Sequence, residues 1–258
     1  MSSELGVRRV KLNRSFSELR TERRRVKMIK FDHDLLEETR KKLDIDLLGV
    51  ASVEGSNSQE LRKQAISLLP GVKSVVVLGK QVYKEVVTLL GPSKSAGEAE
   101  PGELFGPHSD YVNSRLTKAV YDLADIFRKE KYRSLPLPAA GCPTDQRFLK
   151  AVFSYKHAAQ LAGLGTIGRH SLVITPDFGP RVRLACLLTE APLEASPSLE
   201  KKYCLDCDAC IRACPAQALQ VPAPDEAYSM NKFACRTYRQ AGLTCSVCLK
   251  TCNEVLGF

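Results

Sequence analysis

Residues 204–215 read CLDCDACIRACP, and this stretch defines the C-terminal part of the chain. Its spacing is Cys-x2-Cys-x2-Cys-x3-Cys-Pro, which is typical of a bacterial-type [4Fe–4S] site. Thiolates at every third residue of a tight loop line one concave cup around a cubane cluster. The fourth cysteine, carried on a following helix, points away from that cup. The fourth thiolate is therefore expected to serve a second cluster.

Four further cysteines downstream meet that demand, in the pattern Cys235-x9-Cys245-x2-Cys248-x3-Cys252. We expect one cluster to be held by Cys204, Cys207, Cys210 and Cys252 and the other by Cys214, Cys235, Cys245 and Cys248. The x9 gap after Cys235, and Asn253 where a proline is usual, leave the exact partition of the ligands open.

Eight cysteines could also bind zinc or form disulfides. Zinc usually takes two separated Cys-x2-Cys pairs, whereas the consecutive x2 gaps, the x3 gap and the proline favour iron and sulfide. Disulfides are disfavoured because no signal peptide is evident, and thiolate-ligated clusters need a reducing compartment, so we expect a cytoplasmic protein. Cys186 lies in an apolar run and is expected to be a buried structural thiol. Cys142 is assigned no role.

The charge of the chain is unevenly distributed. The chain has 258 residues and a formal net charge of +9, of which +6 falls on residues 1–27. A basic arm of this kind can bind phosphate backbones, but it has no interleaved aromatic residues or glycines, so nucleic acid is a disfavoured partner. The sequence from Met28 reads like a normal start, and we interpret residues 1–27 as a disordered basic extension. No apolar run is long enough to cross a membrane.

Hydrophobic periodicity predicts an α+β domain over residues 28–197, followed by a ferredoxin-like domain over residues 198–258. Gly and Pro are frequent in residues 91–109, which we interpret as a mobile lid. A turn at residues 176–180 is expected to join two strands, 171–175 and 181–189, as a hairpin. The other expected elements are helices at 32–43, 58–68, 112–131 and 148–162 and strands at 45–53, 74–78 and 132–135.

A Gly-rich turn lies just ahead of the cysteines. Glycines let the backbone approach a large or phosphate-bearing ligand, and arginine and histidine supply donors. GLGTIG has the form of a dinucleotide fingerprint, but a helical run and not a strand precedes it, which disfavours NAD. The candidate cofactor-binding residues are Gly163, Gly165, Thr166, Arg169, His170 and Arg181.

Residues 162–193 (AGLGTIGRHSLVITPDFGPRVRLACLLTEAPL), followed by residues 204–219 (CLDCDACIRACPAQAL), resemble the corrinoid-dependent iron–sulfur reductases, meaning epoxyqueuosine reductase and the reductive dehalogenases. The resemblance is to a short form, without helical repeats after Cys252. It implies a nitroreductase-like mixed sheet with flanking helices that holds a base-off cobalamin, and a two-cluster domain that delivers electrons to cobalt. Tyr155, Lys156 and His157 precede the Gly-rich turn and are candidate catalytic proton donors.

We therefore predict an iron–sulfur oxidoreductase that passes single electrons through two [4Fe–4S] clusters to a cofactor, with cobalamin as the candidate, or to a substrate. An external donor of ferredoxin or flavodoxin type would supply the electrons. One alternative is a non-catalytic electron donor or reductive activator. A second is a tRNA-modifying reductase that uses the basic arm. The substrate and the oligomeric state are left open by the sequence.

Overall fold

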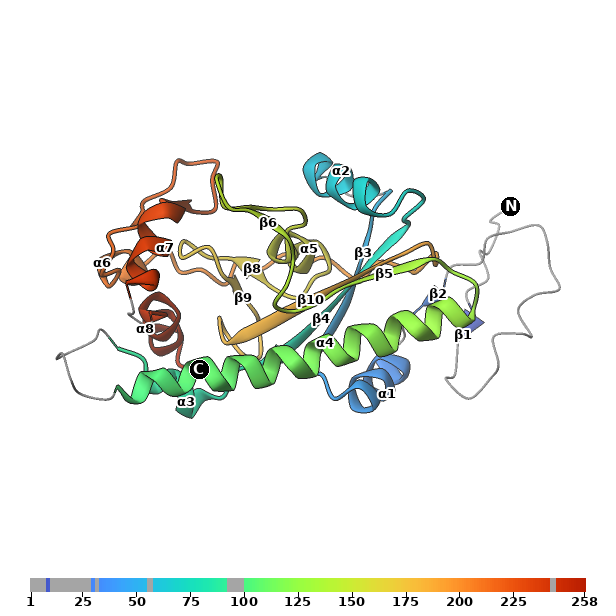
Figure 1. The fold of residues 1–258 in the computed structure, drawn as a ribbon, viewed down its shortest axis with the longest axis horizontal. Helices are drawn as coiled ribbons and strands as arrows, with labels where there is room; N and C mark the ends of the chain where they lie inside the picture. The colour runs from blue at the N-terminus through green and yellow to red at the C-terminus, as the bar shows by residue number, and fades with distance from the viewer. Residues whose placement is uncertain (1–7, 10–28, 31–32, 55–57, 92–99, 242–244) are drawn as a thin grey trace.

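The computed structural model describes residues 8–9, 29–30, 33–54, 58–91, 100–241 and 245–258 (Figure 1). The extension predicted over residues 1–27 lies outside these residues except for β1 (Arg8–Arg9), which pairs in parallel with β2 (Ile29–Lys30). Among the described residues, none of the helices combines the length and the apolar composition needed to span a bilayer.

A four-stranded sheet forms the centre of the larger part of the molecule. Its strands lie in the order β3 (Leu47–Ser52), β4 (Ser74–Gln81), β10 (Val182–Thr189) and β5 (Ser134–Leu137), and every neighbouring pair is antiparallel. The predicted α+β class is confirmed, but the prediction of a mixed sheet is wrong. Helices and strands that alternate along a sequence are typical of parallel crossovers. Here the late strand β10 is inserted between β4 and β5 and runs opposite to both.

The sheet is buried on both faces. In β4, Val75 and Val77 face one core while Val76 and Leu78 face the other, and each is at most 1% exposed. Burial of each such side chain stabilises the fold by about 1.5–3 kcal/mol. Two helices cover each face (Figure 1). They are α2 (Gln59–Leu68) and α5 (Tyr155–Leu161) on the first, and α1 (His33–Leu43) and α4 (Phe105–Lys129) on the second.

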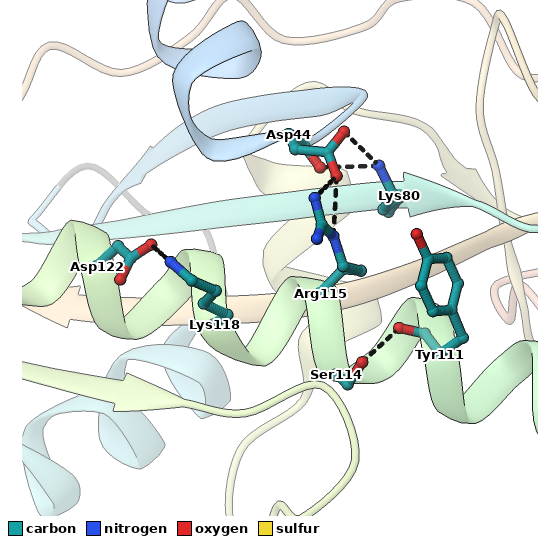
Figure 2. A network of polar contacts seen from close by, with 7 residues as sticks. All are labelled: Asp44, Lys80, Tyr111, Ser114, Arg115, Lys118 and Asp122. Atoms are coloured by element: carbon teal, nitrogen blue, oxygen red, sulfur yellow. Dashed lines mark hydrogen bonds and ion pairs between the residues drawn. The ribbon is translucent and has the colours of Figure 1, made fainter.

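A polar network joins α1, β4 and α4 at the surface (Figure 2). Asp44, which follows α1 with a positive φ of 51°, accepts a bond from Lys80 Nζ at 3.1 Å and from Arg115 Nε at 2.9 Å. These partners, Arg115 first, hold the pKa of the Asp44 carboxyl below its usual range. The network therefore fixes the end of α1 against the middle of α4.

Residues 101–109 are helical, so the prediction of a lid over residues 91–109 is wrong in this part; residues 92–99 lie outside the described residues. A 3-10 helix, η2 (Pro101–Leu104), leads directly into α4. Pro101 stands at its start, where the missing N–H of proline costs nothing. Phe105 is 6% exposed and packs with Val87 and Leu249. Tertiary packing therefore orders a segment whose composition favours a loop.

The strand expected at residues 132–135 is displaced, because β5 continues to Leu137. Pro136 pairs with Leu187 of β10. β5 is an edge strand, so proline removes no hydrogen bond from a second neighbour. Pro136 therefore does not stop the strand, contrary to the prediction.

The region before β10 also differs from the prediction. The helix expected over 148–162 begins only at Tyr155, after a small hairpin of β6 (Thr144–Asp145) and β7 (Lys150–Ala151). β9 (Val173–Ile174) pairs with β8 (Thr166–Ile167) and not with β10. A single bridge, Thr175 to Gly179, closes the turn at 176–180. The predicted hairpin is wrong because β10 has both of its edges occupied by β4 and β5.

The cysteine-rich segment lies at one end of the sheet (Figure 1). It contains the helices α6 (Ala209–Arg212), α7 (Lys232–Gln240) and α8 (Val247–Val255) and the hairpin β11 (Leu219–Gln220) with β12 (Ser229–Met230). Leu249 of α8 packs beside α3 (Lys84–Thr88), and Lys250 Nζ donates to the carbonyl of Leu90 at 2.7 Å. These contacts attach the segment to the sheet domain.

Candidate metal centre

Four of the motif cysteines line one cavity. Cys204 and Cys207 lie in the loop before α6, Cys210 lies in α6 and Cys252 lies in α8, and together they border a small pocket that is partly open to solvent. The loop turns tightly because Asp206 and Asp208 adopt φ angles of 53° and 55°. Asp tolerates this left-handed region better than most residues, so a sequence with an Asp before each of two cysteines suits such a cup.

The other four cysteines form a second group beside the first. Burial and then the neighbouring thiols Cys245, Cys235 and Cys214 raise the pKa of Cys248 to about 12. Cys235 is carried by α7 and Cys248 by α8. Thiols that influence one another in this way lie close together. The structure thus places Cys214, Cys235, Cys245 and Cys248 near one another and beside the four cysteines of the first cavity.

Burial governs the acidity of these thiols. It raises the pKa of Cys210 to about 11, with Cys204 and Cys207 adding to the rise, and the pKa of Cys252 to about 12. Cys248 also contributes to the raised pKa of Cys252, so the two groups are neighbours.

Soft thiolate donors of this kind select zinc, copper(I) or iron–sulfur clusters. Within the described part of the chain, no three Cys, His, Asp or Glu side chains converge on a position for one metal ion.

Arg169 holds the first cysteine loop in place. Its guanidinium donates to the carbonyl of Asp206 at 3.1 Å and to the carboxylate of Asp208. Sequence reasoning missed these two acids, although their positions between the cysteines, downstream of a basic turn, were the available signal. Arg169 therefore stabilises the conformation of the loop. Both of its carboxylate partners, Asp206 and Asp208, belong to the cysteine motif.

His170 lines the same cavity as the first four cysteines. It is 3% exposed, and its Nδ1 accepts a hydrogen bond from the Leu172 N–H at 3.0 Å. Burial lowers the pKa of His170 to about 4, so the imidazole is neutral at pH 7. The proton is then on Nε2, which has no hydrogen-bond partner among the described residues.

The other candidate cofactor residues of the Gly-rich turn, Gly163, Gly165 and Thr166, lie against the backbone of the protein itself. A Cβ on Gly163 would lie 2.1 Å from the Pro197 carbonyl oxygen, and one on Gly165 would lie 2.5 Å from the Ile174 oxygen. Thr166 Oγ1 accepts from the N–H of Tyr203 at 3.0 Å. The backbone approach that glycine permits is therefore made at Gly163 to the segment that leads into the cysteine loop, and at Gly165 to β9.

Arg181 lies apart from these residues, at the junction of β4 and β10. It is 7% exposed, and its Nη1 donates to the carbonyl of Val82 at 2.6 Å. The structure therefore does not bring Arg181 together with Arg169 and His170 around one ligand space.

The three candidate catalytic residues of α5 point in different directions, as consecutive helical residues must. Tyr155 donates to the carbonyl of Pro138 at 2.8 Å, and burial raises its pKa. Lys156 Nζ bonds Ser171 Oγ at 2.6 Å and lies 3.8 Å from the ring centre of Tyr228. His157 Nδ1 bonds Ser154 Oγ at 2.6 Å.

Only Lys156 of these three therefore reaches the cysteine-rich segment, through Tyr228. Burial lowers its pKa and the adjacent ring of Tyr228 opposes that change. Nothing in the local sequence around Tyr228 indicated this contact, because it joins residues that are 72 positions apart in the chain.

The chain combines an α+β domain with a cysteine-rich segment at one end of the sheet. The proteins that it resembles form a class of reductases. Its relatives are the epoxyqueuosine reductases and the reductive dehalogenases, as the sequence motifs predicted. It is 30% identical over 181 residues to the epoxyqueuosine reductase of Prochlorococcus marinus, covering 69% of this chain and 50% of the relative. It is 37% identical over 111 residues to a tetrachloroethene reductive dehalogenase of Desulfitobacterium hafniense, covering 41% and 18%.

Solved structures share the fold. A catabolic reductive dehalogenase in complex with 3-bromo-4-hydroxybenzoic acid matches 85% of this chain and 31% of its own, with a TM-score of 0.63 and 17% identity. Epoxyqueuosine reductase from Streptococcus thermophilus matches 86% and 66%, with a TM-score of 0.51 and 16% identity. No family model matches the chain. The chain spans about half the length of the curated epoxyqueuosine reductases it matches first.

Proposed function

We propose that the protein is an iron–sulfur oxidoreductase whose C-terminal domain holds two [4Fe–4S] clusters. The observation that carries this proposal is the gathering of the eight motif cysteines into two adjacent groups of four. Each group supplies the four thiolates that one cubane cluster requires. Bound clusters supply one-electron transfer, which matches the reductase chemistry named for the curated relatives.

Electrons enter at the first group of cysteines. Cys207 is exposed, and the cavity mouth carries Leu205 and Val255, which are 64% and 45% exposed. An apolar rim around an exposed ligand suits the transient docking of a small electron-transfer protein. The second group lies next to it on the side of α7, whose Arg236 donates to Gln146 of the sheet domain. Electrons would then pass from the first group to the second, which adjoins it.

The boundary between α7 and the sheet domain suits an anionic cofactor. Arg183 of β10 is largely buried, and burial and then the nearby Arg239 of α7 lower its pKa. Burial and, to a lesser extent, Lys232 of α7 likewise lower the pKa of Lys156. Like charges that face each other across a boundary are stabilised by an anion between them.

We propose cobalamin as that cofactor, since its nucleotide loop carries a phosphate and one related fold is that of a reductive dehalogenase described as B12-dependent. Bound cobalamin would supply a cobalt centre that accepts electrons singly. Arg183 and Arg239, which lie near each other, would hold the phosphate.

Metal analysis tests the proposal. Protein purified anaerobically from cells supplied with hydroxocobalamin should contain about eight irons and one cobalt per chain. About eight irons without cobalt would favour the alternative of a non-catalytic electron donor, and zinc in place of iron would refute the cluster assignment. Arg239→Gln should lower the cobalt content and leave the iron unchanged. Arg133→Gln, which removes an exposed ion pair with Glu190, is the matched control and should change neither.

An activity assay follows the metal analysis. The loaded protein, reduced with a low-potential donor, should be assayed on the two substrate classes named for its relatives, an organohalide and epoxyqueuosine. Turnover of either that depends on cobalamin supports the reductase, and turnover without cobalamin would refute the cobalt step and leave the clusters in place.

A further inference from the structure

His170 is held with one edge of its ring against the protein backbone. It follows β8 in a turn where Ser171 has a φ of 69°, and its Nδ1 accepts from the Leu172 N–H at 3.0 Å. A Cβ on Gly168 would lie 3.0 Å from His170 Cε1 and 3.4 Å from Nδ1. The Nδ1 edge therefore faces the turn, which leaves the Nε2 edge toward the cavity that His170 lines.

The Nε2 atom is a buried donor that lacks an acceptor among the described residues. Because Nδ1 accepts a hydrogen bond, the neutral ring carries its proton on Nε2. Buried polar atoms are nearly always satisfied, and one without a partner in a native protein calls for an explanation such as an ion or cofactor. His170 is 3% exposed, so bulk solvent does not supply the acceptor.

The other residues around the cavity narrow the choice of acceptor. Arg169 is a donor only, and the carboxylate of Asp208 is already engaged by Arg169. The remaining lining apart from the cysteines is apolar: Leu205, Ala209, Val255 and Leu256. The sulfur atoms of the four cysteines are within the described residues and accept no bond from Nε2, so the acceptor left is a group that these cysteines bind.

We infer that His170 donates its Nε2–H to a sulfur of the first cluster and thereby raises the reduction potential of that cluster. This inference rests on the proposed function, since it requires a cluster in the first cavity. One-electron reduction makes the cluster one unit more negative, and a donor aimed at sulfur stabilises the more negative state. The histidine thus makes the entry cluster easier to reduce without acting as a ligand.

Two substitutions at position 170 distinguish the role of Nδ1 from the role of Nε2. Asn at position 170 places an amide near Nδ1, so His170→Asn keeps an acceptor for the Leu172 N–H and loses the donor toward the cavity. Gln reaches as far as Nε2, so His170→Gln keeps a donor toward the cavity. Redox titration followed by EPR should show the first cluster of His170→Asn about tenfold harder to reduce, which is about 59 mV for a one-electron couple. His170→Gln should restore most of that loss.

The second cluster serves as the internal reference, and its potential should stay constant in both variants. Cys207→Ser identifies which EPR signal belongs to the first cluster, because it perturbs that signal alone. An unchanged potential in His170→Asn would overturn the inference. A raised potential would overturn it too, because that result means that the histidine acts by excluding water and not by donating a bond.

A spectroscopic readout tests the bond directly. In wild-type protein labelled with ¹⁵N-histidine, the reduced first cluster should show a nitrogen coupling that disappears in His170→Asn. Absence of that coupling in the wild type would also overturn the inference. If iron analysis and EPR find no cluster at all, the proposed function itself fails, so the two failures are distinguishable.

Discussion

Gly163→Ala tests whether the Gly-rich turn serves the protein's own packing. Gly163 has a φ of 70°, and an added Cβ would lie 2.1 Å from the carbonyl oxygen of Pro197, a backbone atom that cannot rotate away. A left-handed conformation costs a non-glycine residue about 1–2 kcal/mol, and overpacking costs about 1–3 kcal/mol. We expect the unfolding free energy to fall by about 3 kcal/mol, which is about 6–12 °C in Tm for a chain of this size.

The matched control is Gly257→Ala. Gly257 has a similar φ of 76°, but nothing lies within 4 Å of its added Cβ, so this variant measures the backbone strain alone. Its expected cost is about 1 kcal/mol, or about 2–4 °C. Thermal melts of both variants and the wild type should be followed anaerobically by circular dichroism at one scan rate. A Gly163→Ala variant that melts no lower than Gly257→Ala would refute the packing argument and return this turn to a ligand-binding role.

Three further predictions concern the cysteine groups and the surface. Cys252→Ser and Cys248→Ser should each retain about four irons, losing different EPR signals, whereas the sheet cysteine variant Cys186→Ala should retain about eight; loss of the same signal from both serine variants would contradict the partition. Arg169→Ala should release the first cysteine loop, so that limited proteolysis cuts it faster and iron is lost from the first cluster; unchanged cleavage would argue against this tether. The lowered pKa of Asp44 means that its ion pairs stabilise the fold above about pH 4 and are lost as the pH falls through the folded pKa. Asp44→Asn should therefore lower Tm at pH 7, and its difference from the wild type should shrink as the pH falls below 4; a difference as large at pH 3 as at pH 7 would contradict the electrostatic account.

The sequence predicted the buried strands and the cysteine spacing because both are local patterns. The run from Val75 to Leu78 reads as a buried strand, and it is β4. The x2 gaps between the first three cysteines predict that they share one space, since only a tight loop can satisfy that spacing. Local patterns do not specify pairing partners. β10 pairs with β4 and β5 and not with the segment just before it. This pairing depends on contacts across more than a hundred residues to β4 and about fifty residues to β5.

For the functional residues too, the sequence shows local patterns but not the contacts between distant segments. The sequence singled out the Gly-rich turn. It does not show, however, whether the atom that approaches a glycine belongs to a ligand or to the protein itself. Arg169 and His170 were also singled out, yet their places at the first cysteine cavity depend on how the turn packs on residues 197–208. Tyr228 had no signal of its own, because its importance arises only from the position of Lys156 above its ring.

The crossing of cysteines between the two proposed cluster sites limits how the module can be divided. Cys214 leaves the first motif to join the later cysteines, while Cys252 returns from α8 to the first cavity. A cut anywhere between them would leave each fragment with an incomplete set of thiols. Unlike a chain of two separate one-cluster repeats, this domain is expected to resist splitting, duplication of one half, or grafting of either half onto another scaffold. Any transplant of its redox chemistry would have to move the whole segment from Cys204 to Cys252 as one piece.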